Sequence, residues 1–313
     1  MIRVGPAGWA YTDWEGILYP APKPRAFRPL VLIARLFDLA EVNATFYAPP
    51  KPETAETWCD QLDEIVAERF RFTVKLWQGL THEPLPPKGE TERLRALLET
   101  LQRRGRLLAV LAQFPWSFKN TAANRARLRE LAGAWSEPWP LAVEVRHGSW
   151  DSEEFRDWLR EHGLPLVNID QPVIGESLPP AAHLTSPRLA YVRLHGRNQK
   201  AWFAENTAAA ERYNYLYQAE ELAPWAVRIG HLGAEARETV VVTNNHFRAQ
   251  AVINGLELQS AVDPQREVPV PPALVEHYPE LRSVPGLRLA TPEELDTSPP
   301  PAKGEGTGQL EMF

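Results

Sequence analysis

Short apolar runs recur along roughly the first 260 residues, and stretches with helical periodicity separate most of them. Continuous apolar runs are typical of parallel strands, because helices cover both faces of a parallel sheet. The pattern predicts strands at residues 3–8, 40–44, 70–76, 107–113, 141–146, 166–170, 189–195 and 239–244. It predicts helices at residues 27–39, 54–69, 90–103, 124–133, 152–162, 208–229 and 247–261. This alternation indicates an α/β fold.

Eight strand–helix units over about 260 residues match the number and length expected of a TIM (β/α)8 barrel. A doubly wound open sheet is the alternative, but no Gly-x-Gly-x-x-Gly motif follows the first strand. We therefore predict a barrel domain at residues 1–261 and a Pro-rich C-terminal extension, packed on or near the barrel, at residues 262–295. Residues 296–308 are rich in Pro and Gly and are expected to be a flexible linker before a short peptide at 309–313.

Polar residues follow the apolar runs that end at His147, Gly196 and His246. In α/β proteins the carboxyl ends of parallel strands are where ligands bind and chemistry occurs. Side chains alternate between the two faces of a strand, so one parity of each run is expected to face the barrel axis. The predicted inward set is Glu41, Asn43, Lys75, Gln113, Glu144, Arg146, Asp170, Arg193, His195 and one of Asn244 and Asn245.

Acids and bases balance in this set, so one interpretation is an internal salt-bridge network that stiffens the barrel. The other is a catalytic site. Lys75 ends an apolar strand, where a desolvated lysine shifts its pKa readily, and Glu144 or Asp170 is a candidate general base with His195 as the acid. Candidate substrate contacts are Arg146 and Arg193 for an anion, together with Asn43, Gln113, Asn244, Asn245 and the aromatic residues Trp9 and Tyr47.

A divalent metal site is the competing chemistry. Its candidate ligands are Glu41, Glu144, Asp170, His195 and His246. The interleaved Lys and Arg residues oppose a cation, and neither His-x-His nor His-Glu-x-x-His occurs. The expected cofactor is therefore none or unknown, with a divalent metal as the open alternative.

The net charge of -6 argues against a protein that coats nucleic acid by bulk charge. A single cysteine, Cys59, fits a reducing compartment, and the N-terminus lacks the layout of a signal peptide. No apolar run approaches the length of a membrane span. These features predict a cytoplasmic protein without a membrane partner.

The chain resembles the YecE-like family, known as domain of unknown function 72, across roughly residues 1–260. The matching pieces, in family order, are Gly8-Trp9, Trp14-x-Gly16, Tyr19-Pro20, Glu41-Val-Asn-Ala-Thr-Phe-Tyr47, Lys75 with Thr81-His82, Gln113-Phe-Pro115, Glu144-Val-Arg-His147 with Trp150, Arg193-Leu-His-Gly196, Tyr213-x-Tyr215 and Asn244-Asn245. The resemblance implies a fold similar to a TIM barrel and implies no settled reaction. The end of the eighth strand departs from the family, with Thr243 and His246 where Phe and an acid are usual.

The last five residues, Gln309-Leu-Glu-Met-Phe313, resemble the Gln-Leu-x-Leu-Phe peptide with which DNA-processing proteins dock on the bacterial sliding clamp. Such peptides are short apolar anchors on flexible tethers. The resemblance implies clamp contacts by Gln309, Leu310, Met312 and Phe313. The alternative is a tail that folds back on the barrel or binds nothing.

Three functional hypotheses follow. The first is a hydrolase or lyase acting on a phosphate-bearing substrate, with damaged nucleic acid as one candidate. The second is a non-catalytic module that binds a ligand or DNA and is recruited to the clamp. The third is a metabolic enzyme of the sugar-phosphate type. No Gly-x-Ser-x-Gly motif is present, which argues against covalent acyl chemistry.

Overall fold

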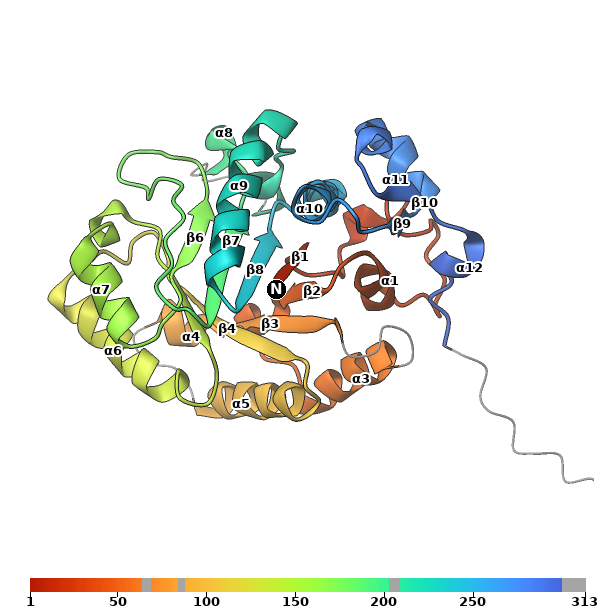
Figure 1. The fold of residues 1–313 in the computed structure, drawn as a ribbon. Coiled ribbons are helices and arrows are strands. Elements are labelled where there is room, and N and C mark those ends of the chain that lie inside the picture. Colours follow the sequence, from red (N-terminus) through yellow and green to blue (C-terminus); the bar gives the residue numbers. More distant parts are fainter. Residues whose placement is uncertain (64–68, 84–87, 203–208, 300–313) are drawn as a thin grey trace, which may run out of the picture.

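Eight parallel strands lie at the centre of the computed structural model, which describes residues 1–63, 69–83, 88–202 and 209–299, and helices surround them (Figure 1). All eight strands predicted from the sequence are present. They are β1 (Ile2–Pro6), β2 (Leu39–Val42), β3 (Arg71–Lys75), β4 (Leu107–Gln113), β5 (Leu141–Glu144), β6 (Val167–Asp170), β7 (Leu189–Leu194) and β8 (Glu238–Thr243).

The strands form two four-stranded parallel sheets, ordered β1-β8-β7-β6 and β2-β3-β4-β5. Single parallel bridges connect the two sheets on both sides, from Ala7 to Glu41 and from Val143 to Leu166. Apolar side chains from both sheets meet in one buried cluster, which includes Leu39 of β2 and Val240 of β8. The prediction of an α/β fold with parallel strands is therefore confirmed.

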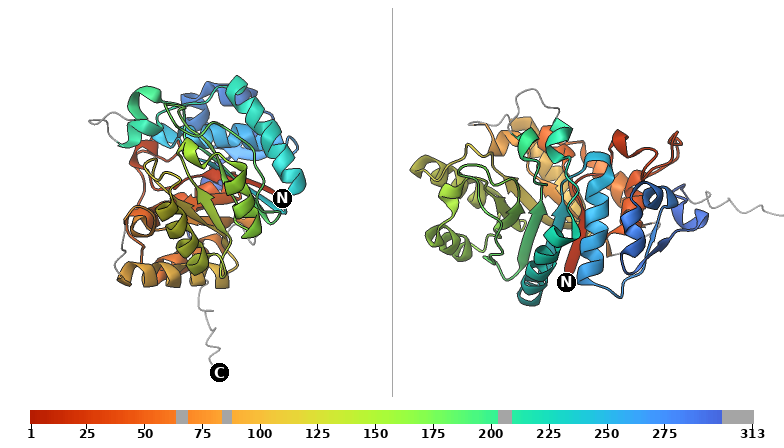
Figure 2. Two further views of the ribbon diagram at one scale, coloured as in Figure 1. Left: turned by 90° about the vertical axis from the view of Figure 1, so that its left-hand side faces the viewer. Right: turned by 90° about the horizontal axis from the view of Figure 1, so that it is seen from above.

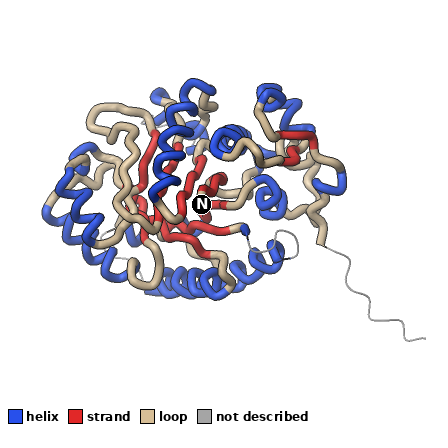
Figure 3. The backbone as a smooth tube through the Cα atoms, viewed as in Figure 1, coloured by secondary structure: helices blue, strands red, loops and turns tan. Residues whose placement is uncertain are grey.

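The larger helices pack around the outside of the two sheets (Figure 3). Helix α7 is an example. Ser152 caps its first turn by accepting from the Phe155 amide, and the side chains of Phe155 and Leu159 are buried on one face of the helix. These helices are α1 (Pro29–Leu36), α3 (Pro52–Asp63), α5 (Lys88–Arg103), α6 (Ala122–Trp135), α7 (Glu153–Glu161), α9 (Ala219–Glu235) and α10 (Gln250–Val262). Short helices α2 (Ala44–Tyr47), α4 (Gln78–Thr81) and α8 (Gln199–Trp202) follow β2, β3 and β7.

The predicted helix at residues 208–229 is wrong in its first half. Residues Ala209–Tyr213 form a 3-10 turn, and α9 begins only after Gln218. Gln218 and Glu221 form a capping box that fixes this start, because each side chain bonds the backbone of the other residue. The predicted helix at 247–261 also begins with a 3-10 turn, Phe247–Ala249, and α10 starts at Gln250.

The C-terminal part of the described chain packs beside α1 (Figure 2). It contains a two-stranded parallel sheet of β9 (Val268–Val270) and β10 (Leu287–Leu289), with helices α11 (Pro272–His277) and α12 (Pro292–Leu295). Arg28 donates from Nε to the Thr297 carbonyl at 2.5 Å, and Arg35 donates to the Asp296 carbonyl at 2.7 Å. These two arginines fasten the segment around α12 to α1.

None of the helices in the described ranges has the length and apolar character needed to cross a membrane. Most of the predicted linker and the predicted clamp contacts Gln309, Leu310, Met312 and Phe313 lie outside the described residues.

Candidate functional site

A buried ion network joins strands of the two sheets near their carboxyl ends. The Arg193 guanidinium donates from Nη2 to Glu41 at 2.6 Å and from Nη1 to Glu144, and all three side chains are at most 1% exposed. The Tyr191 hydroxyl donates to the second oxygen of Glu41 at 2.8 Å. The predicted inward placement of these residues on β2, β5 and β7 agrees with the structure, where they form a buried network of ion pairs.

The Glu144 carboxylate is surrounded by donors. Its Oε1 atom accepts from Arg146 Nε at 2.9 Å and lies 3.3 Å from His195 Nε2, while Arg193 occupies Oε2. Burial alone would raise the pKa of Glu144, but Arg193, Arg146 and His195 hold it well below the usual value. Glu144 therefore stays ionised and positions its three neighbours.

His195 is held by an amide on its other side. Its Nδ1 atom lies 2.9 Å from the Asn244 amide nitrogen, and the Asn43 amide donates to the Asn244 oxygen at 3.4 Å. With Nδ1 as the acceptor, the proton is assigned to Nε2, which lies nearer to Glu144 Oε1, at 3.3 Å, than to the Arg146 Nη2 donor, at 3.5 Å. Burial, reinforced by Arg146 and Arg193 against the opposing effect of Glu144, lowers the pKa of His195 to about 3. The imidazole is therefore neutral near pH 7.

Lys75, which is partly buried, ends β3 in the same region, and its ammonium differs in its contacts from the Arg146 and Arg193 guanidiniums. Its Nζ atom lies 3.7 Å from the centre of the Phe46 ring, and among the described residues it has no hydrogen-bond or ion-pair partner. Burial lowers the pKa of Lys75 to about 7, and the charges of Arg193 and Arg146 add to the effect. Lys75 is thus a cation that titrates near neutral pH.

His82 belongs to this region, although the sequence analysis did not select it as a site residue. Its ring lies 4.9 Å from the Phe46 ring, and its Nδ1 bonds the Thr81 hydroxyl at 2.8 Å. Burial lowers the pKa of His82 to about 4, and the charges of Lys75, Arg146 and Arg127 contribute. The sequence feature that could have indicated His82 is the Thr81-His82 pair in the family resemblance. This pair lies beyond the end of β3, so the alternation of side chains along a strand does not predict which way His82 points.

Aromatic side chains flank the site on the side of β1 and β8. The His246 ring stacks on Tyr11 with centroids 4.5 Å apart and contacts Tyr213 at 4.9 Å. Tyr47 is 70% exposed and is therefore open to a ligand. Trp9, a predicted substrate contact, is partly exposed and packs its ring against Trp58 and Phe72, between α3 and the sheet.

Asp170 does not join the inward set, so its predicted placement is wrong. On β6 the apolar Val167 and Ile169 face the interior between the sheets, which turns Asp170 toward α9. Its carboxylate accepts from Trp225 Nε1 at 2.5 Å, from Arg197 Nη2 at 2.6 Å and from the Tyr217 hydroxyl at 3.0 Å. These contacts make Asp170 a structural anchor for the segment that precedes α9.

Two further predicted contacts are engaged with the protein itself. Gln113 is buried and donates to the Phe114 carbonyl at 2.5 Å. The Asn245 amide donates to the Tyr215 carbonyl and to Asn254, each at 2.8 Å, so it connects the segment before α9 to α10. Only Asn244 of the pair faces the network around His195.

The candidate metal ligands do not form one cluster. Glu41 and Glu144 are occupied by Arg193, Asp170 faces α9, and His246 stacks between tyrosines. Within the described ranges, no three His, Cys, Asp or Glu side chains gather as a metal site requires.

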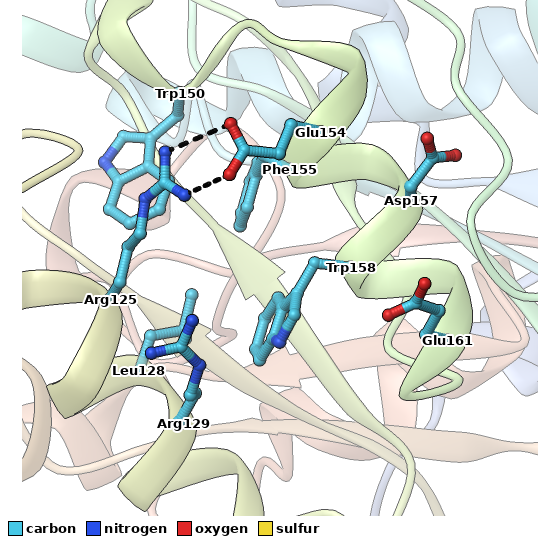
Figure 4. A pocket seen from close by; sticks show the side chains of 9 residues that line it. All are labelled: Arg125, Leu128, Arg129, Trp150, Glu154, Phe155, Asp157, Trp158 and Glu161. Carbon is cyan, nitrogen blue, oxygen red and sulfur yellow. Dashed lines mark hydrogen bonds and ion pairs between the residues drawn. The ribbon is translucent and has the colours of Figure 1, made fainter. Parts of the chain in front are cut away.

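A hollow of about 270 Å³ lies between α6 and α7, on the outside of the fold (Figure 4). Trp158 and Arg129 border it, and an ion pair between Arg125 and Glu154 crosses one side. None of its lining residues belongs to the network around Lys75, so it is separate from the candidate site.

The chain matches known proteins over most of its length. The family model described as "Protein of unknown function DUF72" matches residues 3–277. The UPF0759 protein YunF of Bacillus subtilis (strain 168) is 30% identical over 277 residues, which cover 84% of this chain and 95% of that protein. The UPF0759 protein YecE of Escherichia coli O157:H7 is 26% identical over 62% of this chain and 65% of its own length.

Solved structures agree. A DUF72 family protein from Thermotoga maritima MSB8 superposes with a TM-score of 0.72 at 34% identity, covering 84% of this chain and 99% of that one. A DUF72 family protein from Enterococcus faecalis V583 gives a TM-score of 0.70 at 28% identity, covering 84% and 96%.

Proposed function

The chain belongs to the DUF72 family of proteins of unknown function, and we propose that it is an enzyme acting on a phosphate-bearing substrate beside Lys75. The observation that carries the proposal is the uncompensated positive charge at this position. Lys75 has no ion-pair partner among the described residues, while the acids beside it are already engaged by arginines.

Charge counting supports an anionic ligand. Glu41 and Glu144 balance Arg146 and Arg193, so a protonated Lys75 adds a net positive charge. Arg127 adds another close to His82, since among the described residues its guanidinium donates to the backbone carbonyls of Leu80 and Glu83 and to no carboxylate. The positive charges of Lys75, Arg146 and Arg127 all act on the His82 ring. A phosphate group there would be stabilised by charge-assisted hydrogen bonds.

The pKa directions also favour a particular group for proton transfer. An efficient acid or base has a pKa near the working pH, which Lys75 satisfies with its value of about 7. Glu144, the base predicted from the sequence, has a strongly lowered pKa and three donors around it. His195, the predicted acid, is neutral. We therefore assign proton transfer to Lys75 and positioning to Glu144 and His195, in a lyase or hydrolase reaction.

The strand order supports a closed (β/α)8 barrel as the frame of this site. The two sheets are bridged at β1–β2 and at β5–β6, and those bridges would complete a ring of eight parallel strands. In such barrels the active site lies at the carboxyl ends of the strands, where Lys75 and Glu144 are found.

The test is calorimetric titration with inorganic phosphate at pH 6.5, followed by the same titration of the Arg127→Gln variant. We expect saturable binding that weakens about tenfold in the variant, which corresponds to one lost charge-assisted contact. Arg160→Ala is the matched control, because Arg160 is 43% exposed and lies on α7. Equal affinity in all three proteins, or no saturable binding, would remove the anion site.

The tail sequence favours a second candidate, a role in DNA repair or as an adaptor recruited to the sliding clamp. Gln309-Leu-Glu-Met-Phe313 carries this candidate. Its test is titration of the host's sliding clamp with the full chain and with a chain ending at Gly308. Micromolar binding that the truncation abolishes would direct the substrate search to damaged DNA. Absence of binding by either chain would direct it to phosphorylated metabolites.

A further inference from the structure

We propose that Lys75 is a nucleophile that forms an imine with the carbonyl carbon of its substrate, so that the site takes phosphorylated aldehydes or ketones. The inference rests on the proposed phosphate-binding function. It adds the class of substrate and gives Lys75 a covalent role in place of proton transfer. It makes the enzyme a lyase or a related carbonyl-transforming enzyme, in preference to a hydrolase.

The first support is the position of the amine. Lys75 is the last residue of β3, and its Nζ lies over the face of Phe46, where no described oxygen or nitrogen forms a hydrogen bond with it. An amine attacks a carbonyl through its lone pair, so a nitrogen without hydrogen-bond partners is ready to react once it loses its proton.

The second support is the charge around the amine. Arg193 and Arg146 oppose a further positive charge, and burial opposes it more strongly. At a pKa of about 7, half of the Lys75 amine is neutral near pH 7. An ordinary lysine, with a pKa of about 10.4, is neutral in fewer than about one molecule in a thousand at that pH.

The third support is the contrast with other lysines of the chain. Lys23 pairs with Glu15 at 2.6 Å. Lys119 also lies near an aromatic ring, that of Trp116, but it is 51% exposed and its Nζ lies 3.7 Å from Glu176. Lys119 is therefore a matched internal control, because it has an aromatic neighbour without the buried, cationic surroundings.

The step balances without an oxidant or reductant. The Nζ lone pair forms a bond to the carbonyl carbon, the carbonyl π electrons move to oxygen, and a proton passes from nitrogen to oxygen to give a carbinolamine. A second proton, taken from solvent, lets the hydroxyl leave as water, and the nitrogen lone pair forms the C=N bond. The product is a protonated imine, whose positive charge Glu144 and Glu41 favour as they favour the ammonium. Hydrolysis of the imine restores Lys75.

The experiment uses the full chain, glyceraldehyde 3-phosphate as the probe and sodium cyanoborohydride to reduce any imine to a stable secondary amine. Peptide mass mapping after timed reaction at pH 7 gives the labelling rate of each lysine. We expect Lys75 to be modified about a hundredfold faster than Lys119, because its neutral fraction is far larger. Uncharged glyceraldehyde should label Lys75 more slowly, and inorganic phosphate should protect it from the phosphorylated probe.

The outcomes separate the two proposals. Phosphate binding with Lys75 labelled no faster than Lys119 overturns the nucleophile and leaves the anion site standing. Fast labelling of Lys75 by both aldehydes, with no protection by phosphate, supports the nucleophile and overturns the anion site. The labelling rates of the wild-type protein are sufficient to distinguish these outcomes. In addition, Lys75→Arg should remove the fast adduct.

Discussion

Asn244 donates its side-chain amide to Nδ1 of His195 at 2.9 Å, and this bond determines which imidazole nitrogen carries the proton. The neighbouring Asn43 amide donates to the Asn244 oxygen, which orients the Asn244 side chain. The Nε2 proton of His195 is thereby directed at Glu144. A row of hydrogen bonds from β2 to β5 thus sets the state of one buried histidine.

Replacing Asn244 with Asp should raise the pKa of His195 from its value of about 3. A carboxylate at this position would accept from Nδ1–H and stabilise the imidazolium, in opposition to burial. NMR titration of the histidine ring signals measures the change. The ring of His231, which is exposed on α9, is the internal reference and should not respond to the substitution. An unmoved His195 titration would contradict the assigned tautomer.

The sequence predicts the strands well because buried parallel strands are apolar on both faces. It predicts the inward face where the inner positions carry charge, as on β5 and β7, since Glu144 and Arg193 alternate with apolar residues. On β6 the same rule fails. Both faces of that strand are buried, and the partner of Asp170 is Trp225, which the chain supplies 55 residues later. Parity cannot choose between two buried faces when one holds polar partners from a distant helix.

The lysine environment is also beyond the reach of the sequence alone. Lys75 was expected in the site. Its lack of an ion-pair partner among the described residues depends on the two ion pairs that Arg193 forms, with Glu41 and with Glu144. The packing role of Trp9 depends likewise on Trp58. Both depend on tertiary geometry that no local pattern encodes.

Replacing Glu41 with Gln should lower the free energy of unfolding by about 3 to 5 kcal/mol, because Arg193 would keep one carboxylate where it now has two. Urea denaturation at pH 7 measures the loss. Glu153→Gln is the control, since Glu153 is 60% exposed and pairs with Arg160 on the surface of α7. That change should cost far less, because exposed ion pairs are screened by water and contribute little to stability. Similar losses in both variants would argue that the buried network contributes little.

Replacing Lys75 with Met should raise the free energy of unfolding by about 1 to 3 kcal/mol at pH 6, because the folded protein no longer buries an unpaired ammonium. The pKa of Lys75 is about 7 in the folded state, against 10.5 for an ordinary lysine. Between these values the unfolded chain binds more protons, so wild-type stability should rise with pH and the advantage of Lys75→Met should shrink. Denaturation curves at pH 6 and pH 10 test this, and a pH-independent difference would contradict the lowered pKa.

Replacing Asp170 with Asn should destabilise the fold by about 2 to 5 kcal/mol, because an amide nitrogen would face the donors Arg197 and Trp225. The labelling rate of Lys75 should stay within about threefold of wild type wherever the variant remains folded, because the carboxylate faces α9 and not the site. Thermal melting and aldehyde labelling on the same sample separate the two effects. Full stability combined with slow labelling would indicate that Asp170 takes part in the reaction of Lys75.

The pairing of β1 with β8 has a consequence for how the protein is made. Ile2 pairs with Thr239, so β1 lacks its neighbour on that side until β8 has been synthesised. At usual rates of translation this delay lasts on the order of 10 to 50 s. During that time the β1 edge, with its unpaired amides and carbonyls, is open to association with other chains. The site beside Lys75 is therefore completed only after β8 and the adjoining Asn244, which contacts His195, have been synthesised.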